Sequence, residues 1–75
     1  MTETSPSRGR AVNLSAKEHE TLQLLAEGLN PQEIAVTLKV TTNYVYQIIR
    51  LLKARLDART TAGMVGQAIR EGLVQ

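Results

Sequence analysis

Apolar side chains recur at intervals of three and four residues along the first half of the chain. The positions are Leu22, Leu25, Ala26 and Leu29. This spacing is typical of a helix with one buried face. Ser15 and Glu18, three residues apart, form a capping-box pattern at its start, and Leu14 before the cap suits a hydrophobic staple. Gly28 provides the stop, because glycine adopts a left-handed conformation at little cost.

A second, shorter helix is predicted directly after this stop. Asn30 is suited to the cap and Pro31 to the first helical position, where a missing N–H does no harm. The inner face consists of Ile34, Ala35 and Leu38. The helix ends near Lys39, at a turn where glycine would be the easier residue. Lys39 therefore either adopts the left-handed conformation with some strain, or the turn differs slightly.

A third helix, capped by Thr41 or Thr42 and running to about Leu56, has two contrasting faces. One side is apolar: Val45, Ile48, Ile49, Leu52 and Leu56. The other side, at offsets of three, four and seven, presents Asn43, Tyr46, Gln47 and Arg50. The helix dipole accounts adequately for Lys53 and Arg55 near the C-terminal end. It accounts poorly for the outward Asn, Tyr and Gln. A short helix, a tight turn and a longer helix form the unit that places its second helix in a DNA major groove.

A fourth helix is predicted over about Thr61 to Glu71. Its apolar members are Ala62, Met64, Val65 and Ile69. Gly63 and Gly66 inside it cost about 1 kcal/mol each relative to alanine, and a close contact with another helix would offset this cost. A loosely packed terminal helix is the alternative. Gly72 ends the helix, so that Leu73 and Val74 can fold back onto the core.

The fold class that follows is all-α, a compact four-helix helix-turn-helix domain over residues 13–75. Residues 1–12 lack periodicity and are expected to form a flexible arm; an untethered tail explains Arg8 and Arg10 better than a DNA contact does. The chain has 75 residues, enough for one domain, and 43% of them are apolar. Tyr44 and Tyr46 are the only aromatic residues, so the core is aliphatic. A core this small favours pairing with a second copy.

The net charge is only +2, but the charges are segregated. From residue 14 to 33 the charged residues are Lys17, Glu18, Glu20, Glu27 and Glu33. From residue 39 to 59 they are Lys39, Arg50, Lys53, Arg55, Asp57 and Arg59. One end of the domain is therefore acidic and the other basic. A basic end suits a polyanion, although a solvated charged face explains it equally well.

Several kinds of chemistry find no support. The chain has no cysteine, and His19 is its one histidine, so no metal site is expected. The glutamates read as solvated helix faces, apart from the capping role of Glu18. No nucleophile–base pair or phosphate-cradling loop is present, so we predict neither enzyme activity nor a cofactor. No signal peptide or membrane span is predicted, and a reducing cytosol fits the lack of cysteine.

The span from Leu14 to Val74 resembles the LuxR-type (GerE-like) helix-turn-helix domain without a gap. The matching pieces are Leu14-Ser-Ala-Lys-Glu18-His-Glu20, Leu22, Leu24-Leu-Ala-Glu-Gly-Leu29, Glu33-Ile-Ala35, Leu38, Val40-Thr41, Val45, Leu56 and Gly72-Leu-Val74. The resemblance implies a four-helix DNA-binding domain of a bacterial transcription regulator, located in the cytoplasm on the nucleoid. It also implies a homodimer formed through the last helix, which reads pseudo-palindromic sites with the third.

The resemblance also suggests roles for individual residues. The expected base-contacting residues are Tyr46, Gln47 and Arg50. The expected DNA backbone contacts are Thr41, Thr42, Asn43 and Lys53. The expected dimer interface consists of Ala62, Val65, Gly66 and Ile69. Double-stranded DNA and a second copy of the chain are thus the expected partners.

Some positions depart from the family pattern. Tyr44-Val45-Tyr46 stands where a Thr-Val-Lys run is usual, and Thr61 stands where Arg is usual. The change from Lys to Tyr removes a phosphate or guanine contact, which argues against the family's usual base preference. Ile48 replaces a usual His and Leu51 a frequent Asn. These two widen the apolar face, either for tighter core packing or for an added protein-contact surface.

A protein-interaction module is the competing hypothesis. Such a module would dock on RNA polymerase sigma or on a related regulator, and Ile48 and Leu51 favour it modestly. A fragment similar to sigma region four is less consistent, because the match from Leu14 to Leu29 has no counterpart there. Most relatives attach this domain to a receiver or ligand-binding domain. The Met1 start and the irregular arm favour a small full-length regulator.

Overall fold

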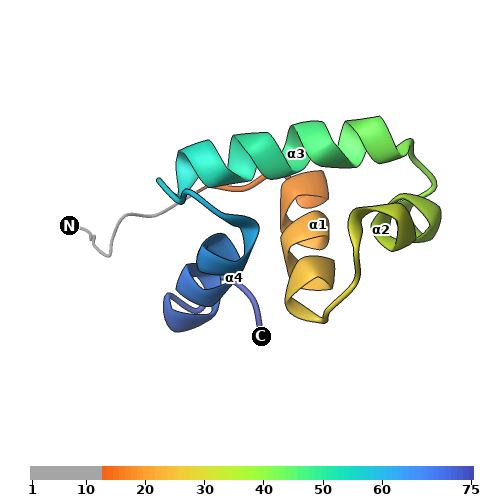
Figure 1. Ribbon diagram of the computed structural model, residues 1–75. Coiled ribbons are helices and arrows are strands. Elements are labelled where there is room, and N and C mark those ends of the chain that lie inside the picture. Colours follow the sequence, from red (N-terminus) through yellow and green to blue (C-terminus); the bar gives the residue numbers. More distant parts are fainter. Residues whose placement is uncertain (1–12) are drawn as a thin grey trace.

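The computed structural model describes residues 13–75, and within them the chain forms four helices and no strand. The helices are α1 (Ala16–Ala26), α2 (Pro31–Leu38), α3 (Thr42–Arg55) and α4 (Thr61–Arg70). Figure 1 shows α3 lying across α1 and α2, with α4 beneath its C-terminal end. The all-α, four-helix prediction is confirmed. The expected arm, residues 1–12, lies outside the described residues.

Reciprocal hydrogen bonds cap both α1 and α2. The Ser15 hydroxyl accepts from the backbone N–H of Glu18 at 3.1 Å, and the Ser15 N–H donates to Glu18 Oε1 at 2.9 Å. Asn30 and Glu33 repeat this arrangement at 2.9 and 2.8 Å, with Pro31 in the first turn. The capping box at Ser15 was predicted. The Asn30–Glu33 box was not, although its spacing is visible in the sequence.

Glu18 has a second role, beyond the predicted cap, that was not predicted. Only 6% of it is exposed, and its Oε2 lies 3.2 Å from Arg55 Nε at the end of α3. Arg55 also donates to the backbone oxygen of Asn13 at 3.5 Å. The tertiary fold thus recruits a local capping residue to tie the start of α1 to the end of α3.

The dual role of Glu18 predicts a graded loss of stability. Glu18→Gln keeps a capping side chain but removes the charge opposite Arg55, so we expect it to cost about 1 kcal/mol. Glu18→Ala removes both interactions and is expected to cost about 2 kcal/mol. Urea unfolding followed by circular dichroism measures both, with Glu20→Ala as an exposed control. Equal losses for the two Glu18 variants would show that the cap contributes nothing.

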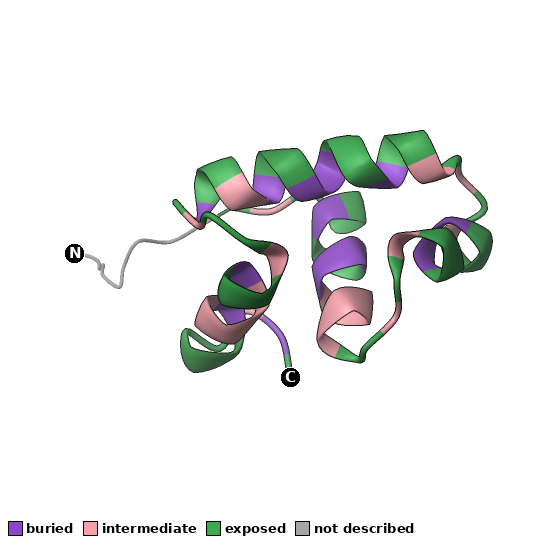
Figure 2. Ribbon diagram, viewed as in Figure 1, coloured by how far each residue is buried: buried purple, intermediate pink, exposed green. Residues whose placement is uncertain are grey.

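The core has two clusters that α3 joins, and Figure 2 shows the buried residues on its inner side. One cluster consists of Leu22, Ile48, Leu52, Leu56, Met64, Ala68 and Val74. The other consists of Ile34, Ala35, Val45 and Ile49. The predicted apolar face of α3 is confirmed in full. Ile48 is 4% exposed and serves the core, whereas Leu51 is 55% exposed and lies on the surface.

Lys39, at the turn between α2 and α3, adopts the left-handed conformation with φ 60° and ψ 45°. Of the two alternatives left open, the strained one is therefore realised. Thr41, not Thr42, caps α3, and its hydroxyl accepts from the Tyr44 N–H at 3.0 Å. A tight turn of this kind sets the angle between the two helices.

Replacing Lys39 with glycine is expected to stabilise the domain by up to about 1 kcal/mol, because glycine has no Cβ penalty at positive φ. Thermal unfolding followed by circular dichroism measures the change. The same substitution at exposed Lys17, within α1, is the control and is expected to destabilise the domain. A loss of stability from Lys39→Gly would contradict the strain inferred at this turn.

The C-terminal tail returns to the core, as predicted. Gly72 has a positive φ of 75°, and Val74 is buried. Gln23 of α1 exchanges two hydrogen bonds with the backbone of Gln75, at 3.1 and 3.3 Å. His19 Nε2 lies 3.2 Å from the Leu73 oxygen. The tail therefore packs α4 against α1.

The fourth helix ends at Arg70, one residue before the predicted end. Met64 and Ala68 are the residues buried from α4, whereas Ile69 is 49% exposed. The buried role of Ala68 was not predicted. None of the helices in residues 13–75 is long and apolar enough to cross a membrane.

Candidate nucleic-acid interface

The outer face of α3 is open to solvent over its whole length. Tyr46 is 47% exposed, and Asn43, Gln47 and Arg50 are also exposed. The opposite side of the helix is anchored in the core, which fixes the direction of these side chains (Figure 2). The predicted separation of an inner apolar face from an outer polar one is therefore present.

The three expected base-contacting side chains are not engaged elsewhere in residues 13–75. No hydrogen bond or ion pair in that part of the chain involves the side chain of Tyr46, Gln47 or Arg50. By contrast, Arg55 on the same helix is bound to Glu18. The structure thus distinguishes an arginine with a structural partner from one whose guanidinium is available to a ligand.

The four expected backbone-contacting residues fall into two places. Thr41, Thr42 and Asn43 lie together at the N-terminal end of α3, and Lys53 lies three turns along it. Thr41 and Asn43 are exposed, whereas Thr42 and Lys53 are half-buried. The Thr41 oxygen is an acceptor in the cap, which leaves its hydroxyl proton for an outside acceptor.

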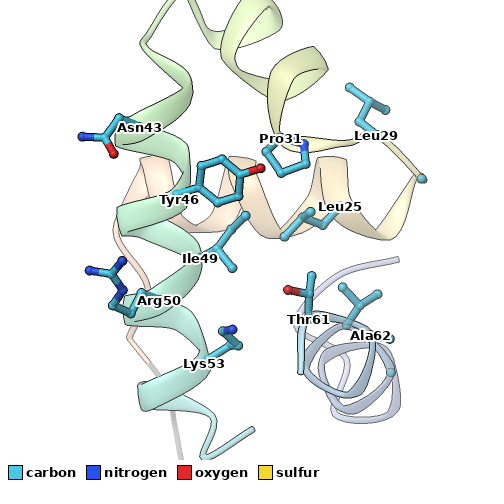
Figure 3. A pocket seen from close by; sticks show the side chains of 13 residues that line it. Leu25, Leu29, Pro31, Asn43, Tyr46, Ile49, Arg50, Lys53, Thr61 and Ala62 are labelled. Carbon is cyan, nitrogen blue, oxygen red and sulfur yellow. The ribbon is translucent and has the colours of Figure 1, made fainter. Parts of the chain in front are cut away.

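A groove of about 940 Å³ lies beside this face, and sequence reasoning did not predict it. Figure 3 shows its walls: Tyr46, Arg50 and Lys53 from α3, Thr61 and Ala62 from α4, and Leu25 from α1. It exists because α4 packs under one end of α3 and not along it (Figure 1). A sequence pattern contains no information on that packing angle.

The four residues expected at a dimer interface share one face of α4. Ala62 and Ile69 are exposed, and Val65 and Gly66 are half-buried. Met64 and Ala68 on the other side hold the helix in the core. A Cβ at Gly66 would lie 3.4 Å from the flexible end of Arg70, so no backbone within residues 13–75 needs this glycine. Ala62, Val65 and Gly66 also line the groove.

Acidic and imidazole side chains do not gather in the described part of the chain. No group of three or more His, Cys, Asp or Glu residues there could hold a metal ion. Glu18 and Glu33 serve helix caps, and Lys17 pairs with Glu20 at 3.7 Å. The polar chemistry that remains is the outer face of α3 and the groove beside it.

Comparison with solved structures identifies proteins with the same fold. The Vibrio cholerae VqmA dimer without target DNA, described as a LuxR-type receptor, matches with a TM-score of 0.82 and 28% identity, over 89% of this chain. The transcription factor GerE matches with a TM-score of 0.79 and 23% identity, over 88% of this chain and 97% of its own. The chain folds as a LuxR-type (GerE-like) helix-turn-helix domain. The predicted resemblance is confirmed.

A third solved structure, a complex of Vibrio cholera VqmA with ligand and DNA, matches this chain with a TM-score of 0.81 and 28% identity. The match covers 96% of this chain. The chain spans only 33% and 32% of the two VqmA chains. No protein-family model and no curated protein matches it. The named neighbours are transcription regulators and not enzymes.

Proposed function

We propose that this chain is a sequence-specific double-stranded DNA-binding transcriptional regulator that acts as a homodimer, with α3 in the major groove. The observation that carries the proposal is the exposed row of Tyr46, Gln47 and Arg50 on a helix whose other side is locked in the core. A rigid helix with such a row meets base edges at fixed positions. The nucleoid in the cytoplasm is the corresponding site of action.

Each side chain in the row suits a particular contact. A guanidinium such as that of Arg50 makes two hydrogen bonds to guanine O6 and N7, and the Gln47 amide pairs with adenine. The Tyr46 ring can lie against a thymine methyl group, or the Tyr46 hydroxyl can donate a hydrogen bond to a phosphate. Thr41, Thr42, Asn43 and Lys53 are proposed to contact the DNA backbone, which sets the register without reading sequence.

Steep salt dependence is the test of DNA binding. In a mobility-shift assay on random duplexes, affinity is expected to fall strongly between two salt concentrations, because bound phosphates release counterions. Selection of bound sequences from the same pool would then define the site. Failure to shift DNA even at low salt would refute the proposal.

Pairing through α4 is proposed for the homodimer. Ile69 is half-exposed, and the only neighbour within residues 13–75 that a Cβ at Gly66 would meet is the flexible end of Arg70. Two chains related by a twofold axis would place their α3 helices about 34–36 Å apart on one DNA face. Pseudo-palindromic sites of that spacing are expected from the selection.

Gly66→Leu is expected to block this pairing. A bulky side chain on the α4 face would keep two helices apart, so affinity for a paired site should fall while half-site binding persists. Gly66→Ala is the control, since it adds helix propensity without bulk. Analytical ultracentrifugation measures the dimer, and mobility shifts on paired and single half-sites measure binding. An unchanged dimer in Gly66→Leu would refute the α4 interface.

A second candidate function is a protein-interaction module that docks on RNA polymerase or another regulator. Leu51, 55% exposed, and Tyr44, 39% exposed, give α3 an apolar flank beside the polar row. Ile48 no longer supports this candidate, because it is buried. Copurification with polymerase, without a salt-sensitive DNA shift, would favour the module over the DNA-binding regulator.

A further inference from the structure

The groove beside α3 has an apolar floor that DNA binding does not require. Leu25, Leu29, Ile49 and Val65 line it, together with the ring of Pro31. Base edges and phosphates are met by the side chains that project outward from α3, and these need no aliphatic surface behind them. Val65 also belongs to the proposed α4 pairing face, but Leu25, Leu29, Ile49 and Pro31 do not. This part of the floor suits a ligand with an apolar body.

The rim of the groove carries one sign of charge. Arg50 and Lys53 line it from α3, and none of its lining residues is acidic. Figure 3 shows Lys53 on the groove side of α3, whereas the Arg50 guanidinium lies at the outer side of the helix. Asn43 and Tyr46 of α3 and Thr61 of α4 add hydrogen-bonding groups to the lining. An apolar floor with Lys53 beside it and the exposed Arg50 at its outer edge matches a molecule with an apolar body and an anionic end.

The size of the groove favours a small molecule. Its volume of about 940 Å³ lies within the range of roughly 300–1,000 Å³ that is usual for small-molecule sites. Three elements bound it: α3, the N-terminal half of α4, and the segment from α1 to the start of α2. Such a ligand would lie against Tyr46 and Arg50, two of the proposed base-contacting residues.

We propose that the groove between α3 and α4 binds a small anion with an apolar body, such as an aromatic or aliphatic carboxylate or sulfonate, and that this ligand displaces DNA. The anion would accept from Lys53, and from Arg50 after its exposed side chain turns toward the groove, while its body covers Leu25, Leu29 and Val65. Displacement of DNA rests on the proposed function, because it needs Tyr46 and Arg50 to contact bases. Binding of the anion itself does not.

Anilinonaphthalene sulfonate is the probe for the binding step, and uncharged phenylnaphthylamine is its control. The sulfonate is expected to bind the folded chain with enhanced fluorescence and at least about tenfold more tightly than the neutral compound. The groove wall overlaps the proposed α4 pairing face. The titration is therefore done at a protein concentration at which the chain sediments as a monomer in analytical ultracentrifugation. Equal affinity for the two compounds would overturn the proposal.

Glycine amide signals locate the bound probe. Gly28 and Gly66 line the groove, whereas Gly72 does not. In proton–nitrogen correlation spectra, the signals of the first two are expected to shift on titration, and that of Gly72 is expected to stay. A probe that shifts Gly72 and leaves Gly28 and Gly66 unchanged binds elsewhere and contradicts the site.

Paired charge variants test the rim. Arg50→Gln with Lys53→Gln is expected to weaken sulfonate binding by roughly fivefold to tenfold. Lys17→Gln with Arg59→Gln changes the net charge equally, away from the groove lining, and is expected to have little effect. Circular dichroism checks that both variants fold. If both double variants weakened sulfonate binding equally, net charge alone would explain the effect, and the proposed role of Arg50 and Lys53 would be refuted.

A final arm separates the two proposals. If the chain binds DNA, the sulfonate is expected to raise the apparent Kd for DNA, whereas the neutral compound is not. Sulfonate bound at the groove without DNA binding would refute the proposed function and leave the anion site standing. DNA binding without a sulfonate site would refute the anion site alone.

Discussion

Leu52→Ala is expected to cost the domain about 3 kcal/mol of unfolding free energy. Leu52 is fully buried in the last turn of α3, in the cluster that joins α1, α3 and α4. Removing its side chain leaves a cavity that rigid helices close only in part. A domain of this size rarely has more than about 3–5 kcal/mol in reserve, so a large unfolded fraction is expected at room temperature.

The adjacent residue offers a matched control for this prediction. Leu51 is 55% exposed, so Leu51→Ala is expected to change stability by no more than about 0.5 kcal/mol. Urea unfolding of both variants, followed by far-ultraviolet circular dichroism, compares one chemical change on opposite faces of one helix. Similar losses for Leu51→Ala and Leu52→Ala would contradict the described orientation of α3.

Arg50→Ala is expected to relax base preference at one position of the selected DNA site. A bidentate contact to guanine gives about 1–3 kcal/mol of discrimination against the other bases. The variant should therefore bind the preferred and substituted sites almost equally. Titrations against duplexes that differ at single positions measure this loss of discrimination.

Lys53→Ala is the comparison for Arg50→Ala, because a phosphate contact carries no sequence information. It is expected to weaken binding to all sequences alike and to lower the slope of log K against log salt by about 1. Arg59→Ala, beyond the end of α3, serves as a further charge control. Equal loss of specificity from Arg50→Ala and Lys53→Ala would contradict the separation of base and backbone contacts.

The features that the sequence predicted well depend on interactions between near neighbours. The cap at Ser15 and the stop at Gly28 each arise from a few consecutive residues, whereas for Lys39 the sequence left two kinds of turn open. The inner face of α3 follows from a period of 3.6 residues, which any helix imposes. The same period predicts the outward direction of Tyr46 and Arg50, which the fold confirms.

The features that the sequence did not predict join residues far apart in the chain. The sequence predicts only a local capping role for Glu18. The approach of α1 to α3 in the folded domain brings Arg55 to the second carboxylate oxygen of Glu18, Oε2. Leu51 is an apolar residue that could widen the packed face of α3, yet it stays 55% exposed in the folded domain. Neighbours along a helix cannot decide such cases, because burial depends on which element covers the helix.

The amino-acid order alone thus determined the four helices, their caps and the polar row on the third, since these depend on short-range hydrogen bonds and helical periodicity. Tertiary packing alone decided the place of α4. By lying under one end of α3, that helix creates the groove, with an apolar floor beside Lys53 of α3. The angle between packed helices depends on side-chain shapes from several elements at once, so no single stretch of sequence determines it.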